Sequence, residues 1–223
     1  MLKLAIFDVD GTLIDSQALI IRAMEEAHDA TAMPMPPRAR VLSIVGLSLE
    51  TAFMTLHPGL EAAALDALVH RYKATFTRLR ASGVDDPPFY DGALDALARL
   101  ERDGWLLGIA TGKARRGLNH LLDRHGLHAR FIATQTADDA PSKPHPGMVQ
   151  NLLSATGVDT CAAVMIGDTS FDIEMGRAAG VRAVGVGWGY HPPEALHAAG
   201  ADVVIQHYGD LDAALETALA NAA

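Results

Sequence analysis

The chain has 223 residues, of which 49% are hydrophobic and 20% are charged, a composition that fits one large domain or a core with a smaller one. Its net charge of −9 argues against nucleic acid as a partner, because nucleic-acid phosphates are bound by basic surfaces. The single cysteine, Cys161, excludes an internal disulfide and suits a reducing compartment.

The sequence also lacks the marks of a targeted or membrane protein. Met1 leads straight into an apolar run, without the basic and apolar stretches of a signal peptide. No uninterrupted apolar segment is long enough to cross a bilayer. We therefore expect a cytoplasmic protein with no membrane partner.

The first apolar run, residues 4–7, predicts a buried strand that ends in two carboxylates. Asp8 and Asp10 would share a side if the strand geometry continued that far, and Gly11 lets the chain turn out of the sheet. Two buried carboxylates are costly unless a cation lies between them, and a divalent metal is the obvious candidate. The alternative is an acidic turn that contacts only water.

Residues 16–82 show helical periodicity and no convincing strand. Ser16 and Ser48 are candidate N-caps, and a further long helix is predicted over residues 61–80. Prolines break the pattern at 34–37 and at Pro58, and residues 85–88 would return the chain. We predict an all-helical insertion, residues 16–86, in a core formed by residues 1–15 and 87–223.

The rest of the chain alternates between strands and helices. Strands are predicted at 106–110, 131–133, 163–166, 183–186 and 203–205, with helices at 93–102, 117–124, 147–156, 173–179, 193–199 and 211–220. The strands are apolar throughout, which is typical of a parallel sheet covered on both faces. The fold prediction is therefore α/β, a Rossmann-like doubly wound parallel sheet with the helical segment inserted after the first strand.

Ligands of such sheets bind at the carboxyl ends of the strands. These ends, together with the loop after the third strand, carry Asp8, Asp10, Thr111, Gly112, Lys143, Asp168 and Asp172. Taken alone, Thr111 would cap the next helix, Lys143 would be a solvated lysine, and the last two aspartates would cap a helix N-terminus. Together, in this order, they favour a single site.

Phosphoryl transfer through an aspartyl phosphate is the chemistry that needs this set. Asp8 would be the nucleophile, and Asp10 would donate a proton to the leaving alkoxide and then take one from the attacking water. Lys143 would neutralise the nucleophile and the transferring group. Thr111, through its hydroxyl, and Gly112, through its N–H, would hold phosphate oxygens.

The same pattern predicts a magnesium site. Mg²⁺ would be held by the carboxylates of Asp8 and Asp168 and by the backbone carbonyl of Asp10. Asp172 would orient Lys143 or a water on the metal. The cation would offset the repulsion between the clustered carboxylates and a phosphate dianion.

Four motifs carry a resemblance to a known family. They are residues 8–13 (DVDGTL), residues 110–112 (ATG), Lys143-Pro144, and Gly167-Asp168 followed by Asp172. The chain resembles phosphatases of the haloacid dehalogenase superfamily, in the subgroup that includes phosphoglycolate phosphatases. The resemblance implies a helical cap that closes over the site, and it names 2-phosphoglycolate as a candidate substrate. Asp10 places the chain with the phosphatases, because dehalogenases of the superfamily lack this aspartate.

Two other functions stay open from the sequence. A sugar-phosphate phosphotransferase or mutase of the same superfamily is less favoured, because Leu49 stands where mutase relatives usually carry an arginine. A phospho-accepting signalling domain would need neither Asp10 nor a cap. The expected partner is a small phosphorylated metabolite, and the protein is expected to be a monomer or a homodimer.

Overall fold

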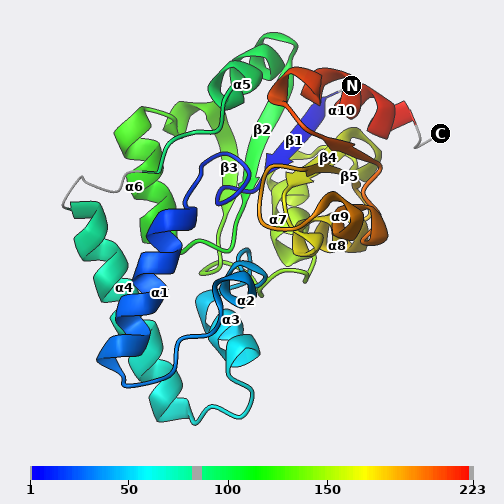
Figure 1. Cartoon of the computed structure of the whole chain (residues 1–223). Coiled ribbons are helices and arrows are strands. Elements are labelled where there is room, and N and C mark those ends of the chain that lie inside the picture. Colours follow the sequence, from blue (N-terminus) through cyan, green and yellow to red (C-terminus); the bar gives the residue numbers. More distant parts are fainter. Residues whose placement is uncertain (1, 82–86, 221–223) are drawn as a thin grey trace.

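In the computed structural model, which describes residues 2–81 and 87–220, six parallel strands form one sheet (Figure 1). The strand order is β3-β2-β1-β4-β5-β6, so the chain reverses direction across the sheet between β1 and β4. The strands are Lys3–Phe7 (β1), Trp105–Ala110 (β2), Phe131–Gln135 (β3), Ala163–Gly167 (β4), Arg182–Val186 (β5) and Val203–Ile205 (β6). The predicted doubly wound parallel sheet is confirmed.

Helices cover both faces of the sheet because its strands are apolar on both sides. One face packs against α5 (Ala93–Arg102), α6 (Arg115–His125) and α10 (Leu211–Ala220). The other packs against α7 (Gly147–Thr156), α8 (Ser170–Ala178) and α9 (Pro193–Ala198). Within β1, Phe7 belongs to the first layer and Ile6 to the second, as strand alternation requires.

Four helices lie between β1 and α5 and pack together beside the sheet (Figure 1). They are α1 (Gln17–Ala30), α2 (Arg38–Leu42), α3 (Leu49–Leu56) and α4 (Ala62–Ala81), and we call residues 17–81 the helical insertion. It has its own apolar cluster, which includes Met24, Phe53 and Leu68. None of the described helices of the chain is long and apolar enough to cross a membrane.

The starts of α1 and α8 agree only in part with the sequence predictions. Ser16 does occupy the N-cap position of α1, but its hydroxyl caps no backbone group and lies 3.0 Å from the Tyr190 hydroxyl. Helix α8 begins at Ser170, ahead of the predicted residue 173, because Thr169 and Asp172 form a capping box. Residues 85 and 86 of the predicted return segment lie outside the described residues.

The two chain segments that join the helical insertion to the core run side by side. Ile14 and Phe89 form an antiparallel β-bridge. The N–H of Asp15 donates to the carbonyl of Pro88 at 2.9 Å, and the N–H of Tyr90 donates to the carbonyl of Leu13 at 3.0 Å. The insertion therefore leaves and rejoins the core at one place.

A histidine pair links α1 to the end of α3 within the helical insertion. His28 is buried, its Nδ1 lies 2.7 Å from the carbonyl oxygen of Met24, and its Nε2 lies 2.9 Å from Nε2 of His57. Burial, reinforced by His28, lowers the pKa of His57 below its usual value of 6.5. The folded state therefore favours the neutral imidazole of His57.

We expect the contribution of His57 to lower the free energy of unfolding as the pH falls below about 6.5, a sign opposite to that of the buried acids with raised pKa values. The unfolded chain then binds a proton at residue 57 that the folded chain resists, whereas above this pH both states are neutral there. Denaturant unfolding at pH 7.5 and 5.5 measures the total change, and His57→Gln should remove the contribution of His57 from it. His120→Gln, at an exposed position, is the matched control. An equal change in wild type and His57→Gln would contradict the assignment.

Candidate active site

Three predicted residues meet directly at the carboxyl ends of β1 and β4. Asp8 follows β1 and is buried, and Nζ of Lys143 lies 2.7 Å from its Oδ1. The same ammonium donates to Oδ1 of Asp172 at 2.5 Å. The second oxygen of Asp172 accepts from the N–H and the hydroxyl of Thr169 at 3.0 and 2.7 Å. Asp172 is thus both the partner of the lysine and part of the α8 capping box.

Asp168, at the end of β4, is fixed by donors from two distant segments. Its Oδ1 accepts from the hydroxyl of Thr12 at 2.8 Å, and its Oδ2 accepts from the N–H of Tyr190 at 2.8 Å. Gly11 and Gly189 allow this close approach, because a Cβ at either position would come within 2.3 Å of the carboxylate. The carboxylate is therefore held in one orientation.

The electrostatics of this cluster are those of buried acids around one buried cation. Burial raises the pKa of Asp8 from 3.8 to about 6, against the opposing effect of Lys143. Burial also raises the pKa of Asp168, and Asp172 and Asp8 add to this effect. For Lys143, burial is outweighed by Asp172 and Asp8, so its pKa is raised. Without further positive charge, the carboxylates repel one another.

The residues present fit a divalent cation. One carboxylate oxygen from each of Asp8, Asp168 and Asp172 lies within 4.8 Å of the others. Neither oxygen of Asp8 has a geometric hydrogen-bond partner among the described residues, and Lys143 meets Oδ1 as an ion pair at 2.7 Å. A buried carboxylate with unfilled acceptors is what a hard cation requires. The predicted backbone ligand, the carbonyl of Asp10, stays a prediction.

The side chain of Asp10 turns away from this cluster. The strand ends at Phe7, and Nζ of Lys113 lies 2.7 Å from both oxygens of Asp10. The side chains of Asp8 and Asp10 are therefore paired with different lysines. Lys113 was not among the residues predicted for the site, although its place directly after Thr111 and Gly112 was an available signal.

The predicted phosphate ligands Thr111 and Gly112 lie with Asp8 and Asp10 around one cavity. Thr111 is buried and caps no helix, since its hydroxyl accepts from the N–H of Lys113 at 3.2 Å. Gly112 touches the loop between α2 and α3: a Cβ here would lie 2.3 Å from the carbonyl oxygen of Gly46 and 2.8 Å from that of Leu47. Glycine is thus required for this contact.

Gly112→Ala is expected to push this loop of the helical insertion away from the core. A displacement of about 1 Å in substrate-positioning groups lowers kcat/KM roughly 10- to 100-fold. Steady-state kinetics on a phosphate monoester, together with thermal unfolding, measures the effect. Gly209→Ala is the control, because a Cβ there meets no atom within 4 Å. Unchanged kinetics for Gly112→Ala would show that the contact does not matter.

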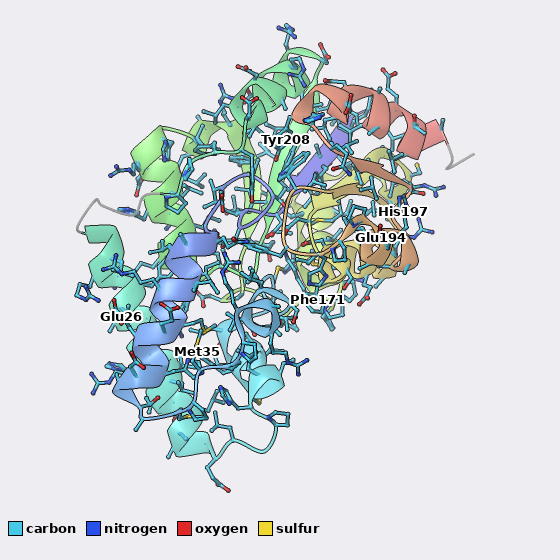
Figure 2. The ribbon with its side chains drawn as sticks, in the orientation of Figure 1. Glu26, Met35, Phe171, Glu194, His197 and Tyr208 are labelled. Carbon is cyan, nitrogen blue, oxygen red and sulfur yellow. The ribbon has the colours of Figure 1, made fainter. Side chains whose placement is uncertain are left out.

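Other contacts join the same loop to the core. The N–H of Ser48 donates to the hydroxyl of Ser142, next to Lys143, at 2.8 Å. Nε2 of His191 lies 3.2 Å from the carbonyl oxygen of Ser43. Phe171 of α8 stands at this boundary (Figure 2), and its ring would lie 3.7 Å from a Cβ on Gly46. The insertion is thus seated directly over the strand ends.

A family model described as haloacid dehalogenase-like hydrolase matches residues 5–186. The chain belongs to this family. The matched range includes all seven residues predicted for the site and the whole helical insertion. The resemblance inferred from the motifs is confirmed, and so is the prediction that the protein is an enzyme of the hydrolase class.

Individual relatives match this hydrolase over most of its length. It is 34% identical over 215 residues to the "Probable phosphatase IndB" of Dickeya dadantii, with 95% of the chain and 92% of the relative covered. It is 33% identical over 218 residues to the "Phosphoglycolate phosphatase" of Caulobacter vibrioides, with 96% and 90% covered. A crystal structure of a predicted phosphatase from Clostridium acetobutylicum, 24% identical, aligns with a TM-score of 0.85 over 97% of this chain and 100% of that one, which shows the shared fold.

Proposed function

We propose that this hydrolase is a magnesium-dependent phosphatase for small phosphate monoesters. The observation that carries the proposal is the carboxylate of Asp8, buried beside Lys143, without a hydrogen bond from the described residues, and in contact with the cavity. A carboxylate in this state can attack phosphorus. The names of the two relatives support a phosphatase.

The positions of the residues support the following roles. A carboxylate oxygen of Asp8 forms a bond to phosphorus while the bond to the ester oxygen breaks, giving an aspartyl phosphate. In its acid form Asp10, which also lines the cavity, gives a proton to the leaving alkoxide and becomes the carboxylate. It then takes a proton from the water that attacks the aspartyl phosphate, which releases inorganic phosphate and restores Asp8.

The surrounding groups hold the phosphoryl group and balance its charge. Thr111 and Gly112 bind its oxygens, and Lys143, held by Asp172, neutralises Asp8. Asp8, Asp168 and the backbone carbonyl of Asp10 would hold Mg²⁺, which when bound supplies positive charge that a phosphate dianion needs among these carboxylates. The helical insertion acts as the cap that excludes water.

A screen of phosphorylated metabolites, read out as released phosphate with Mg²⁺ or with EDTA, tests the proposal. We expect turnover of at least one monoester with Mg²⁺ and none with EDTA. 2-Phosphoglycolate belongs in the screen as the candidate that the resemblance names, and p-nitrophenyl phosphate serves as a permissive substrate. No turnover of any compound, p-nitrophenyl phosphate included, would overturn the proposal.

A further inference from the structure

The cavity beneath the helical insertion has two unlike parts. It holds about 370 Å³ and lies between the insertion and the carboxyl ends of the strands. Its polar part carries the reaction groups Asp8, Asp10, Thr111 and Gly112. The wall contributed by the insertion is mainly apolar and includes Met24, Val45, Leu47, Leu49, Tyr72 and Phe76. The phosphate and the rest of the substrate therefore meet different chemistry.

The cations around the cavity are engaged or lie at its rim. Among the described residues that the insertion gives to the lining, only Glu50 and Lys73 are charged, and they pair with each other at 3.1 Å. Both are about half exposed, with 51% and 53% of their side-chain surface accessible, so this pair stands at the mouth. Lys113 is paired with Asp10, and Arg116 is exposed. Nζ of Lys113 lies 5.4 Å from the centroid of the Phe76 ring, but it is paired with Asp10. Among the described residues, the apolar wall therefore offers an anionic leaving group no cation outside an ion pair.

This lining discriminates between classes of alcohol. A carboxylate moved from water against an apolar wall loses its hydration without gaining a partner, whereas each methylene group that leaves water there is favourable. Glycolate is also small compared with the space, since cavities of about 300–1,000 Å³ accommodate drug-sized molecules. The wall therefore favours a leaving group that is uncharged and larger than glycolate.

We propose that the preferred substrate is a phosphate monoester whose alcohol part is uncharged, largely apolar and larger than glycolate. The phosphoryl group sits by Asp8, Thr111 and Gly112, and the alcohol part lies against the apolar wall that includes Leu49, Tyr72 and Phe76. This inference rests on the proposed phosphatase activity and assigns the substrate class of that same site.

A series of primary alkyl phosphates isolates the contribution of the wall. Ethyl, butyl and hexyl phosphate have similar leaving groups, so differences in kcat/KM report contacts of the chain and not chemical reactivity. With Mg²⁺ we expect kcat/KM to rise about threefold per added methylene group, on the order of 100-fold from ethyl to hexyl phosphate. We expect 2-phosphoglycolate to fall below butyl phosphate.

Two variants test where the selectivity arises. Leu49→Lys places a cation in the wall. It should weaken the increase of kcat/KM with alkyl chain length and raise kcat/KM for 2-phosphoglycolate. The matched control is Leu94→Lys, the same change at an exposed leucine of α5, which should leave the series unchanged. Should Leu49→Lys fail to fold, the wild-type series alone decides the question.

The outcomes separate this inference from the proposed function. Turnover of all the esters with no dependence on chain length, or a preference for 2-phosphoglycolate, would overturn the apolar substrate class and leave the phosphatase standing. If the preference for 2-phosphoglycolate disappeared in Arg116→Gln, the carboxylate of this substrate would be bound by Arg116 at the rim of the cavity. No turnover of any ester, p-nitrophenyl phosphate included, would overturn the phosphatase itself.

Discussion

Asp8→Asn is expected to lower kcat for any phosphate monoester by a factor of about 10⁴ or more, the scale seen when a covalent nucleophile is removed. Asparagine has nearly the same shape but cannot form the acyl phosphate, so the covalent route is lost. Phosphate release measures the effect. A variant that kept activity within about tenfold of wild type would exclude Asp8 as the nucleophile.

The Asp8→Asn variant should remain folded, and the raised pKa of Asp8 predicts the direction in which its stability changes. The pKa of Asp8 is about 6 in the folded chain, above the ordinary value of 3.8 that applies when the chain is unfolded, so the folded state binds this proton more tightly. Stability from this group is therefore greatest at low pH and is lost as the pH rises through about 6. At pH 7.5, in EDTA, Asp8→Asn should unfold at the same temperature as wild type or a higher one, which separates lost chemistry from lost structure.

Lys143→Met is expected to destabilise the protein by about 3–5 kcal/mol, because it leaves buried carboxylates without their cation. For a chain of this size the loss corresponds to a fall in Tm of roughly 6–20 °C. Asp8 and Asp172 both lie within ion-pair distance of Lys143, and Asp168 is close to them. Denaturant unfolding in EDTA at pH 7.5 measures the change.

The pH dependence of this loss identifies its cause. Lowering the pH to 5.5 should reduce the difference in the free energy of unfolding between Lys143→Met and wild type. Buried acids with raised pKa values then take up protons, so the repulsion between their carboxylates falls. Lys73→Met removes an exposed, ion-paired lysine and should change stability by less than about 1 kcal/mol. A comparably small loss for Lys143→Met would show that the buried cluster does not depend on its lysine.

Much of the fold followed from local patterns. The apolar strands and the helical periodicity between them predict the parallel sheet, and the predicted helices 93–102, 147–156 and 211–220 coincide with α5, α7 and α10. The start of α1 after Ser16 was predicted correctly, but the contact made by the Ser16 hydroxyl was not. The hydroxyl of Ser16 is directed to Tyr190, 174 positions along the chain, and not to its own helix.

The residues of the candidate site that lie at the carboxyl ends of strands could be predicted, because ligands of parallel sheets bind there. That rule brought Asp8, which follows β1, together with Asp168 and Asp172, which follow β4, and in the structure Lys143 contacts Asp8 and Asp172. The pairing of Lys113 with Asp10 could not be predicted, because it depends on the turn that the chain makes after Phe7. The N–H that fixes Asp168 comes from the backbone of Tyr190, and a backbone donor leaves no signature in sequence.

The paired connections at Ile14 and Phe89 have a consequence for how such an enzyme can change. Neighbouring strands lie about 4.8 Å apart, so the ends of the inserted segment are close enough for another segment with equally close ends to replace it. The exchange would leave the strand register and the pairing of Lys143 with Asp8 and Asp172 untouched. With substrate selection proposed for the insertion and bond breaking for the core, the two properties would be inherited separately. A recombination event that exchanged the insertion between two such genes would then change the substrate preference in one step.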